Sequence, residues 1–143
     1  MNKAQGFEFT ENAHPVRMTA WGKTVSELFR NSLRGMAELM KPTVLTARDG
    51  AKKVTQMLRV EAVDVNTLLV AFLSEVSGLS DIHNLVFTNV TLKDIGDDFL
   101  EAELSGVQID SIENEVKAVS YQDVDIKRSR ESGMYETTLE FDI

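Results

Sequence analysis

The last ten residues of the chain, 134–143, largely alternate polar and apolar side chains. A period of two is the pattern of a β-strand with one buried face. Leu139, Phe141 and Ile143 are therefore expected to face a core, with Asp142 on the opposite face. Such a strand would hold the Asp142 carboxylate close to the main-chain carboxylate of Ile143. Two anions at that spacing are relieved by solvent or by a cation, and the spacing alone leaves both readings open.

Two segments, 25–40 and 65–76, have the period of an amphipathic helix, and each follows a predicted strand. The first opens on a capping box, in which the Thr24 side chain and Glu27 satisfy free amides at the helix start. Each helix is expected to lie between an N-cap residue and a helix-breaking residue. These boundary residues are Thr24 and Pro42 for the first helix, and Asp64 and Gly78 for the second.

Strand-like patterns make up most of the remaining chain. The predicted strands cover residues 6–10, 16–21, 54–62, 85–92, 99–104, 115–120, 122–127 and 134–143, and a loop is expected over 43–50. The long run of strands after the second helix favours an α+β fold with antiparallel hairpins. We expect one domain over residues 1–143. It would have a mostly antiparallel sheet, or sheets, of about eight strands and two amphipathic helices packed on one face.

The composition narrows the range of functions. The 143 residues carry 15 basic and 23 acidic side chains, and this formal charge of −8 disfavours strong direct binding to nucleic acid. Cysteine is absent, which excludes thiol catalysis and disulfides. No uninterrupted apolar run has membrane-spanning length, and no signal-peptide-like region is found, so a cytoplasmic protein without membrane contact is expected. The oligomeric state is not indicated.

No catalytic motif stands out in the sequence. There is no Gly-rich phosphate loop, no His-x-x-x-His and no Gly-x-Ser-x-Gly. We therefore predict that the chain is not an enzyme. A hydrolase with an unrecognised site stays open as a further reading, and it would require a deep polar pocket with converging titratable groups.

Five segments together resemble one known family, archease, in the same order and with similar spacing over nearly the whole chain. They are Gly-Phe-Glu-Phe at 6–9, Ala-Trp-Gly-Lys-Thr at 20–24, Leu-Leu-Val-Ala-Phe-Leu-Ser-Glu at 68–75, Glu-Val-Lys-Ala-Val-Ser-Tyr at 115–121 and Phe-Asp-Ile at 141–143. The last two segments, taken together, are the most specific. The amphipathic helices alone would not identify a family.

The resemblance implies a role as a protein cofactor. Archease assists the RNA-splicing ligase that joins tRNA halves, by promoting guanylylation of the ligase and its multiple turnover. The implied partner is therefore that ligase. The resemblance also implies a divalent cation, Ca²⁺ or Mg²⁺, held by an aspartate after the first strand and by an aspartate of the terminal strand.

Only one of these two aspartates has a counterpart here, namely Asp142. Pro15 stands where the family has its N-terminal aspartate, Asn12 where it has a histidine, and Gln122 where it often has another histidine. The candidate metal ligands are then Asp142, the carboxylate of Ile143, a side-chain oxygen of Asn12 and a ring nitrogen of His14. The proline puts the cation in doubt, because Ca²⁺ and Mg²⁺ sites in proteins need carboxylate oxygens.

These departures motivate an alternative function. The chain would be an archease-fold binding or chaperone module that has lost the metal-dependent activation of the ligase.

Overall fold

The computed structural model describes residues 5–46 and 53–143, and within them the chain forms two antiparallel sheets and two long helices. The larger sheet has the order β1 (Phe7–Phe9), β2 (Val16–Gly22), β8 (Tyr135–Asp142) and β6 (Ala118–Val119), and β7 (Lys127–Arg128) also pairs with β8. The smaller sheet has the order β3 (Lys53–Glu61), β5 (Phe99–Gln108) and β4 (Leu85–Ile95). The predicted α+β class is confirmed.

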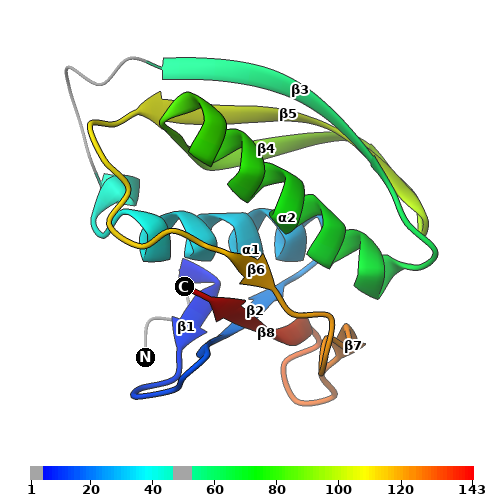
Figure 1. Cartoon of the computed structure of the whole chain (residues 1–143). Coiled ribbons are helices and arrows are strands. Elements are labelled where there is room, and N and C mark those ends of the chain that lie inside the picture. The colour runs from blue at the N-terminus through cyan, green and yellow to red at the C-terminus, as the bar shows by residue number, and fades with distance from the viewer. Residues whose placement is uncertain (1–4, 47–52) are drawn as a thin grey trace.

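Helix α1 (Val25–Met40) lies between the two sheets (Figure 1), where it packs against β4 on one side and β2 on the other. The Thr24 half of the predicted capping box is confirmed, because the Thr24 hydroxyl accepts a 3.0 Å hydrogen bond from the Glu27 amide. Helix α2 (Val65–His83) lies beside α1 on the same face of the smaller sheet, against β3 and β4 (Figure 1). Both helices thus cover one face of that sheet, and the larger sheet closes the other side of α1.

Helix α2 (Val65–His83) is longer than predicted, and the prediction that Gly78 ends it is wrong. The helix continues past Gly78, where Leu79 packs against the core, and it ends at Asn84 in a left-handed conformation with φ 53° and ψ 48°. By length and composition, α2 could cross a membrane. Its Leu68, Leu69, Phe72 and Leu73 side chains are fully buried in the core, as expected for the central helix of a domain.

The strands predicted over 115–120 and 122–127 shrink to the two-residue strands β6 and β7. In the segment between β6 and β7, the last two main-chain amides form hydrogen bonds with side chains and not with a neighbouring strand. The Asp125 amide donates to the Thr137 hydroxyl at 3.1 Å, and the Ile126 amide donates to the Asn66 side chain at 2.9 Å. The predicted loop after α1 includes a short 3-10 helix, η2 (Val44–Thr46), and its residues 47–50 lie outside the described part of the chain.

Candidate functional site

The terminal strand β8 is held on both sides near its end. Phe141 pairs with Val16 of β2 and with Val119 of β6, and its side chain is fully buried. The main-chain oxygen of Asp142 accepts a 2.7 Å hydrogen bond from the Lys117 amide. The prediction that residues 139 and 141 face the core is confirmed. The prediction for Ile143 is wrong, because the side chain is 42% exposed beyond the last paired residue.

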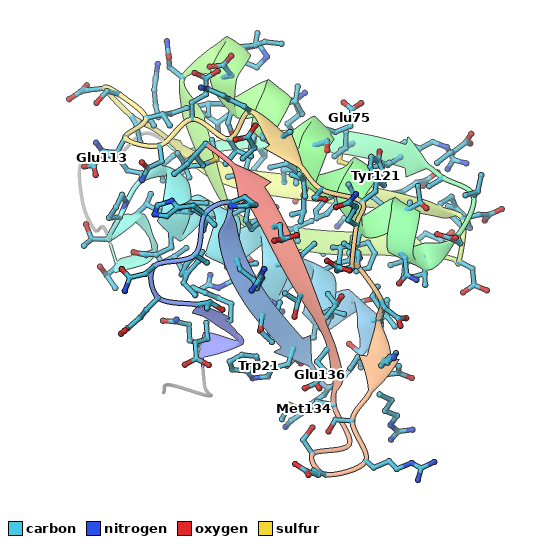
Figure 2. The ribbon with its side chains drawn as sticks, turned by 60° about the horizontal axis from the view of Figure 1, so that its bottom comes forward. Trp21, Glu75, Glu113, Tyr121, Met134 and Glu136 are labelled. Atoms are coloured by element: carbon cyan, nitrogen blue, oxygen red, sulfur yellow. The ribbon has the colours of Figure 1, made fainter. Side chains whose placement is uncertain are left out.

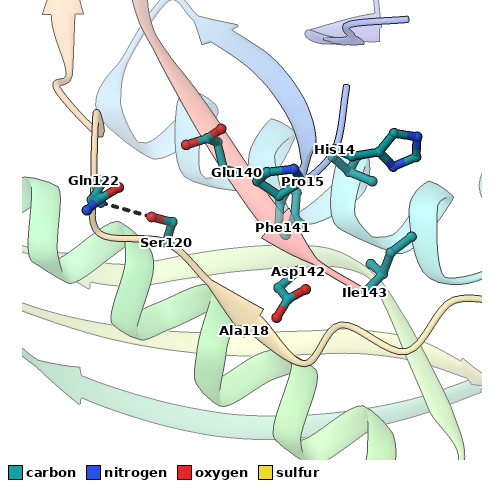
Figure 3. A pocket seen from close by; sticks show the side chains of 10 residues that line it. His14, Pro15, Ala118, Ser120, Gln122, Glu140, Phe141, Asp142 and Ile143 are labelled. Atoms are coloured by element: carbon teal, nitrogen blue, oxygen red, sulfur yellow. Dashed lines mark hydrogen bonds between the residues drawn. The ribbon is translucent and has the colours of Figure 1, made fainter. Parts of the chain in front are cut away.

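A pocket of about 630 Å³ opens at this end of β8 (Figure 3). Three segments that are far apart in the sequence contribute to it: the start of β2, the β6 region and the end of β8. The lining residues are His14, Pro15, Val16, Ala118, Ser120, Gln122, Glu140, Phe141, Asp142 and Ile143. Trp21 and Glu136, which pair across β2 and β8, lie at the opposite end of these strands (Figure 2).

Two carboxylate side chains of β8 line the pocket, and they differ in environment. Asp142 is exposed, and its side chain points toward β6 near Ala118 (Figure 3). The Glu140 side chain is only 13% exposed, and its Oε2 lies 3.1 Å from Nη2 of Arg17 on β2. Sequence reasoning missed Glu140, although the period of two places it on the same face of the strand as Asp142.

The candidate metal ligands from the N-terminal segment, Asn12 and His14, do not converge on Asp142. His14 lines the pocket, but it is exposed and its imidazole points away from the Asp142 carboxylate (Figure 3). Asn12 is an exposed turn residue with φ 58°, and it is not among the residues that line the pocket. Pro15 does line the pocket and brings no side-chain oxygen to it. The structure therefore gathers His14, Asp142 and Ile143 in one pocket and leaves Asn12 outside.

The side chains of this pocket fit a hard divalent cation poorly. Ca²⁺ takes about six to eight oxygen ligands and Mg²⁺ about six in a strict octahedron. Within residues 5–46 and 53–143, no group of three or more His, Cys, Asp or Glu side chains could hold a metal ion. One of the two acidic side chains, Glu140, is already paired with Arg17. The four-residue metal site stays a prediction, and no chemical step is derived through it.

Two further hydrogen bonds join residues of the pocket around the end of β6. The main-chain amide of Ser120 donates to the carbonyl of Glu140 at 3.0 Å. The main-chain amide of Gln122 donates to the Ser120 hydroxyl at 3.1 Å (Figure 3). The deep polar pocket with converging titratable groups that a hydrolase would require is not formed by these residues, because His14 points outward and Glu140 is engaged by Arg17.

Comparisons with known proteins agree with this fold. The chain is 25% identical to protein archease of Methanosarcina acetivorans over 136 residues, covering 90% of each chain. It is 30% identical to protein archease of Pyrococcus furiosus over 129 residues, covering 85% of this chain and 88% of that relative.

Two solved structures are similar over almost the full length. The solution structure of Methanobacterium thermoautotrophicum protein 1598 superimposes with a TM-score of 0.72 at 25% identity, covering 97% of this chain and 99% of that chain. An archease from Thermotoga maritima, described as a possible chaperone, gives a TM-score of 0.60 at 15% identity, covering 89% of each chain. A family model for the archease protein family (MTH1598/TM1083) matches residues 7–143. The chain therefore belongs to the archease family.

Proposed function

We propose that the chain is a protein cofactor that assists guanylylation and multiple turnover of a tRNA-splicing RNA ligase. The observation that carries the proposal is the composition of the pocket at the end of β8. It is built from the two segments whose resemblance to archease is most specific, through Ala118 and Ser120 of the first and Asp142 of the second. Membership of the archease family over residues 7–143 supports the same role.

In this proposal the chain acts by docking and carries out no chemistry itself, in the cytoplasm. Asp142 is exposed at a place that main-chain hydrogen bonds hold in position, so its carboxylate is available to a partner. Its main-chain bond to Lys117 sets the position of the carboxylate without using the side chain. A basic side chain of the ligase is the complementary group for such a carboxylate.

The test is a ligation assay with the cognate ligase in excess RNA substrate, with and without this chain. Added chain should raise both the number of turnovers and the guanylylated fraction of the ligase. Asp142→Ala should remove the stimulation. Asp97→Ala is the matched control, because it removes another exposed aspartate, in the turn between β4 and β5 and outside the lining of the pocket. No stimulation by the wild-type chain at any concentration would refute the proposal.

One observation favours the alternative of a binding or chaperone module without metal-dependent activity. Pro15 lines the pocket at the position where the sequence resemblance places an aspartate. Calorimetric titration with Ca²⁺, Mg²⁺, Mn²⁺ and Zn²⁺ separates the two functions. Stoichiometric binding that is lost in Asp142→Ala would reject the alternative, whereas stimulation of the ligase without any metal binding would reject the metal-dependent form of the first proposal.

A further inference from the structure

A second pocket, of about 480 Å³, lies where α1 meets η2 and β4. It shares no residue with the pocket at the end of β8. Two arginines and four uncharged polar residues make up its lining together with one leucine, and no carboxylate is among them. The polar residues are Gln5, Arg30, Asn31, Arg34, Thr46 and Asn89. A cationic pocket of this kind is unusual on a chain whose formal charge is −8.

Arg30 and Arg34 are four residues apart on α1 and therefore lie on the same face of the helix. Like charges at this spacing destabilise a helix unless an anion compensates them. In the described part of the chain, neither arginine forms an ion pair, whereas Arg17 and Arg59 each pair with glutamate. Glu27, one turn before Arg30, does not pair with it either. No described carboxylate thus forms an ion pair with either arginine, although Glu27 lines a neighbouring pocket together with Arg30.

The two guanidinium groups are also the donors that remain free to bind a ligand. Arg34 is oriented by a 3.2 Å hydrogen bond from Nη1 to the carbonyl of Thr88, which lies at an irregularity of β4 between Phe87 and Asn89. Its other nitrogens make no hydrogen bond within residues 5–46 and 53–143, and Arg30 makes none there with its side chain.

The uncharged donors of the pocket are largely used within the fold. The side-chain nitrogen of Asn31, Nδ2, donates to the main-chain carbonyl of Trp21 at 2.7 Å. The side-chain nitrogen of Gln5, Nε2, donates to the main-chain carbonyl of Phe7 at 3.1 Å. These bonds hold the walls of the pocket in place, and the ligand is left to the guanidinium groups.

We propose that this pocket binds the phosphate group of a small phosphorylated ligand. The planar donor fork of arginine matches the geometry of phosphate oxygens, and two such forks on one helix face can bind the same group. The pocket volume is within the range of roughly 300–1,000 Å³ that is typical of small-molecule sites. The inference is independent of the role with the ligase, because it uses neither Asp142 nor the pocket at the end of β8.

The test is calorimetric titration of the full chain with inorganic phosphate, pyrophosphate and guanosine triphosphate, at constant ionic strength set with sodium chloride. At least one of the three should bind to a single site. Arg30→Gln and Arg34→Gln should each weaken the binding about tenfold or more, the effect of losing a hydrogen bond to a charged group. Arg130→Gln removes the same charge from an exposed residue outside the pocket and should bind like the wild type.

Arg30→Gln is the decisive variant, because the Arg30 side chain makes no hydrogen bond within the described fold. Its loss removes the repulsion with Arg34 and should therefore not lower the unfolding transition. Amide NMR shifts on titration should concentrate at Asn31 and Asn89. The proposal is overturned if none of the three anions binds at millimolar concentration, or if Arg130→Gln weakens binding as much as Arg30→Gln. Because neither outcome involves the ligase, this test can fail while the ligation assay succeeds, and the reverse.

Discussion

Two glycines, each inside one of the long helices, should respond differently to the same substitution, Gly→Ala. Gly78 lies within α2, and a β-carbon there would meet nothing within 4 Å. Gly35 lies within α1 at its contact with β2, where a β-carbon would overlap the thioether of Met18 and approach the ring of Phe7 at 3.0 Å. Met18 and Phe7 are 0% and 1% exposed, so neither can move into solvent.

The magnitudes follow from helix propensity and packing. Alanine is favoured over glycine in a helix interior by about 1 kcal/mol, and this is the whole effect expected at Gly78. At Gly35 the same gain is opposed by about 1–3 kcal/mol of overpacking, because the added methyl group must displace Met18 within a filled core. Gly78→Ala should therefore stabilise the chain by about 1 kcal/mol, and Gly35→Ala should be neutral or destabilising by up to about 2 kcal/mol.

Urea unfolding monitored by circular dichroism measures both variants on the same scale. In thermal unfolding, 1 kcal/mol corresponds to a shift of about 3 °C for a domain of this size. In a double-mutant cycle, Gly35→Ala should cost less in the Met18→Ala background than in the wild type, because the side chain that it would displace is already absent. Equal stabilisation by the two single substitutions would refute the argument that Gly35 is required for the close approach of α1 and β2.

Four further substitutions test other parts of the structure. Thr24→Ala removes the hydroxyl that accepts from the Glu27 amide, and it should cost about 1 kcal/mol in urea unfolding. Phe141→Ala empties a fully buried position between β2 and β6, and it should cost about 3–5 kcal/mol in the same assay. The hydrogen bond from the Thr67 amide holds the pKa of Asp64 below its usual value near 3.8. The stabilisation that Asp64→Ala removes should be complete above about pH 4 and fade as the pH falls through the lowered pKa, in urea unfolding at a series of pH values. Pro15→Asp adds a carboxylate to the pocket at the end of β8 and should raise its affinity for Ca²⁺ in calorimetry.

Local signals in the sequence predicted those parts of the fold that depend on neighbouring residues. The capping box at Thr24 involves a side chain and an amide three residues apart, so it could be recognised without the fold. The end of α2 could not, because the helix passes Gly78 and its next residue, Leu79, packs against a core formed by distant parts of the chain. The short strands β6 and β7 were overpredicted for a similar reason. The Ile126 amide binds Asn66, a side chain 60 residues away, in place of a neighbouring strand.

The candidate site was predicted to the extent that the period of β8 determines it. Alternation placed Asp142 on the face opposite Phe141, and the structure puts it in the pocket. Glu140 was missed because its role depends on Arg17, which reaches it only through the pairing of β2 with β8. Asn12 was included because of its place in the sequence, but a turn with positive φ keeps it outside the lining of the pocket.

The charge balance of the pocket at the end of β8 bears on what can occupy it. Two acidic side chains line it, and the contact with Arg17 offsets the charge of Glu140, leaving Asp142 as its unpaired side-chain anion among the described residues. The exposed Asp142 carboxylate is well hydrated, and water also relieves its repulsion from the adjacent main-chain carboxylate of Ile143, so no bound cation is required for the folded chain to be stable. The Asp142 carboxylate can instead exchange its water for the ammonium or guanidinium group of a partner at low cost in desolvation. The apolar side chains of Pro15, Val16 and Ile143 line the same pocket and are exposed or partly exposed, so they provide contact area for such a partner. With proline at position 15, the surface is therefore better suited to recognition of a protein side chain than to binding a metal ion by itself.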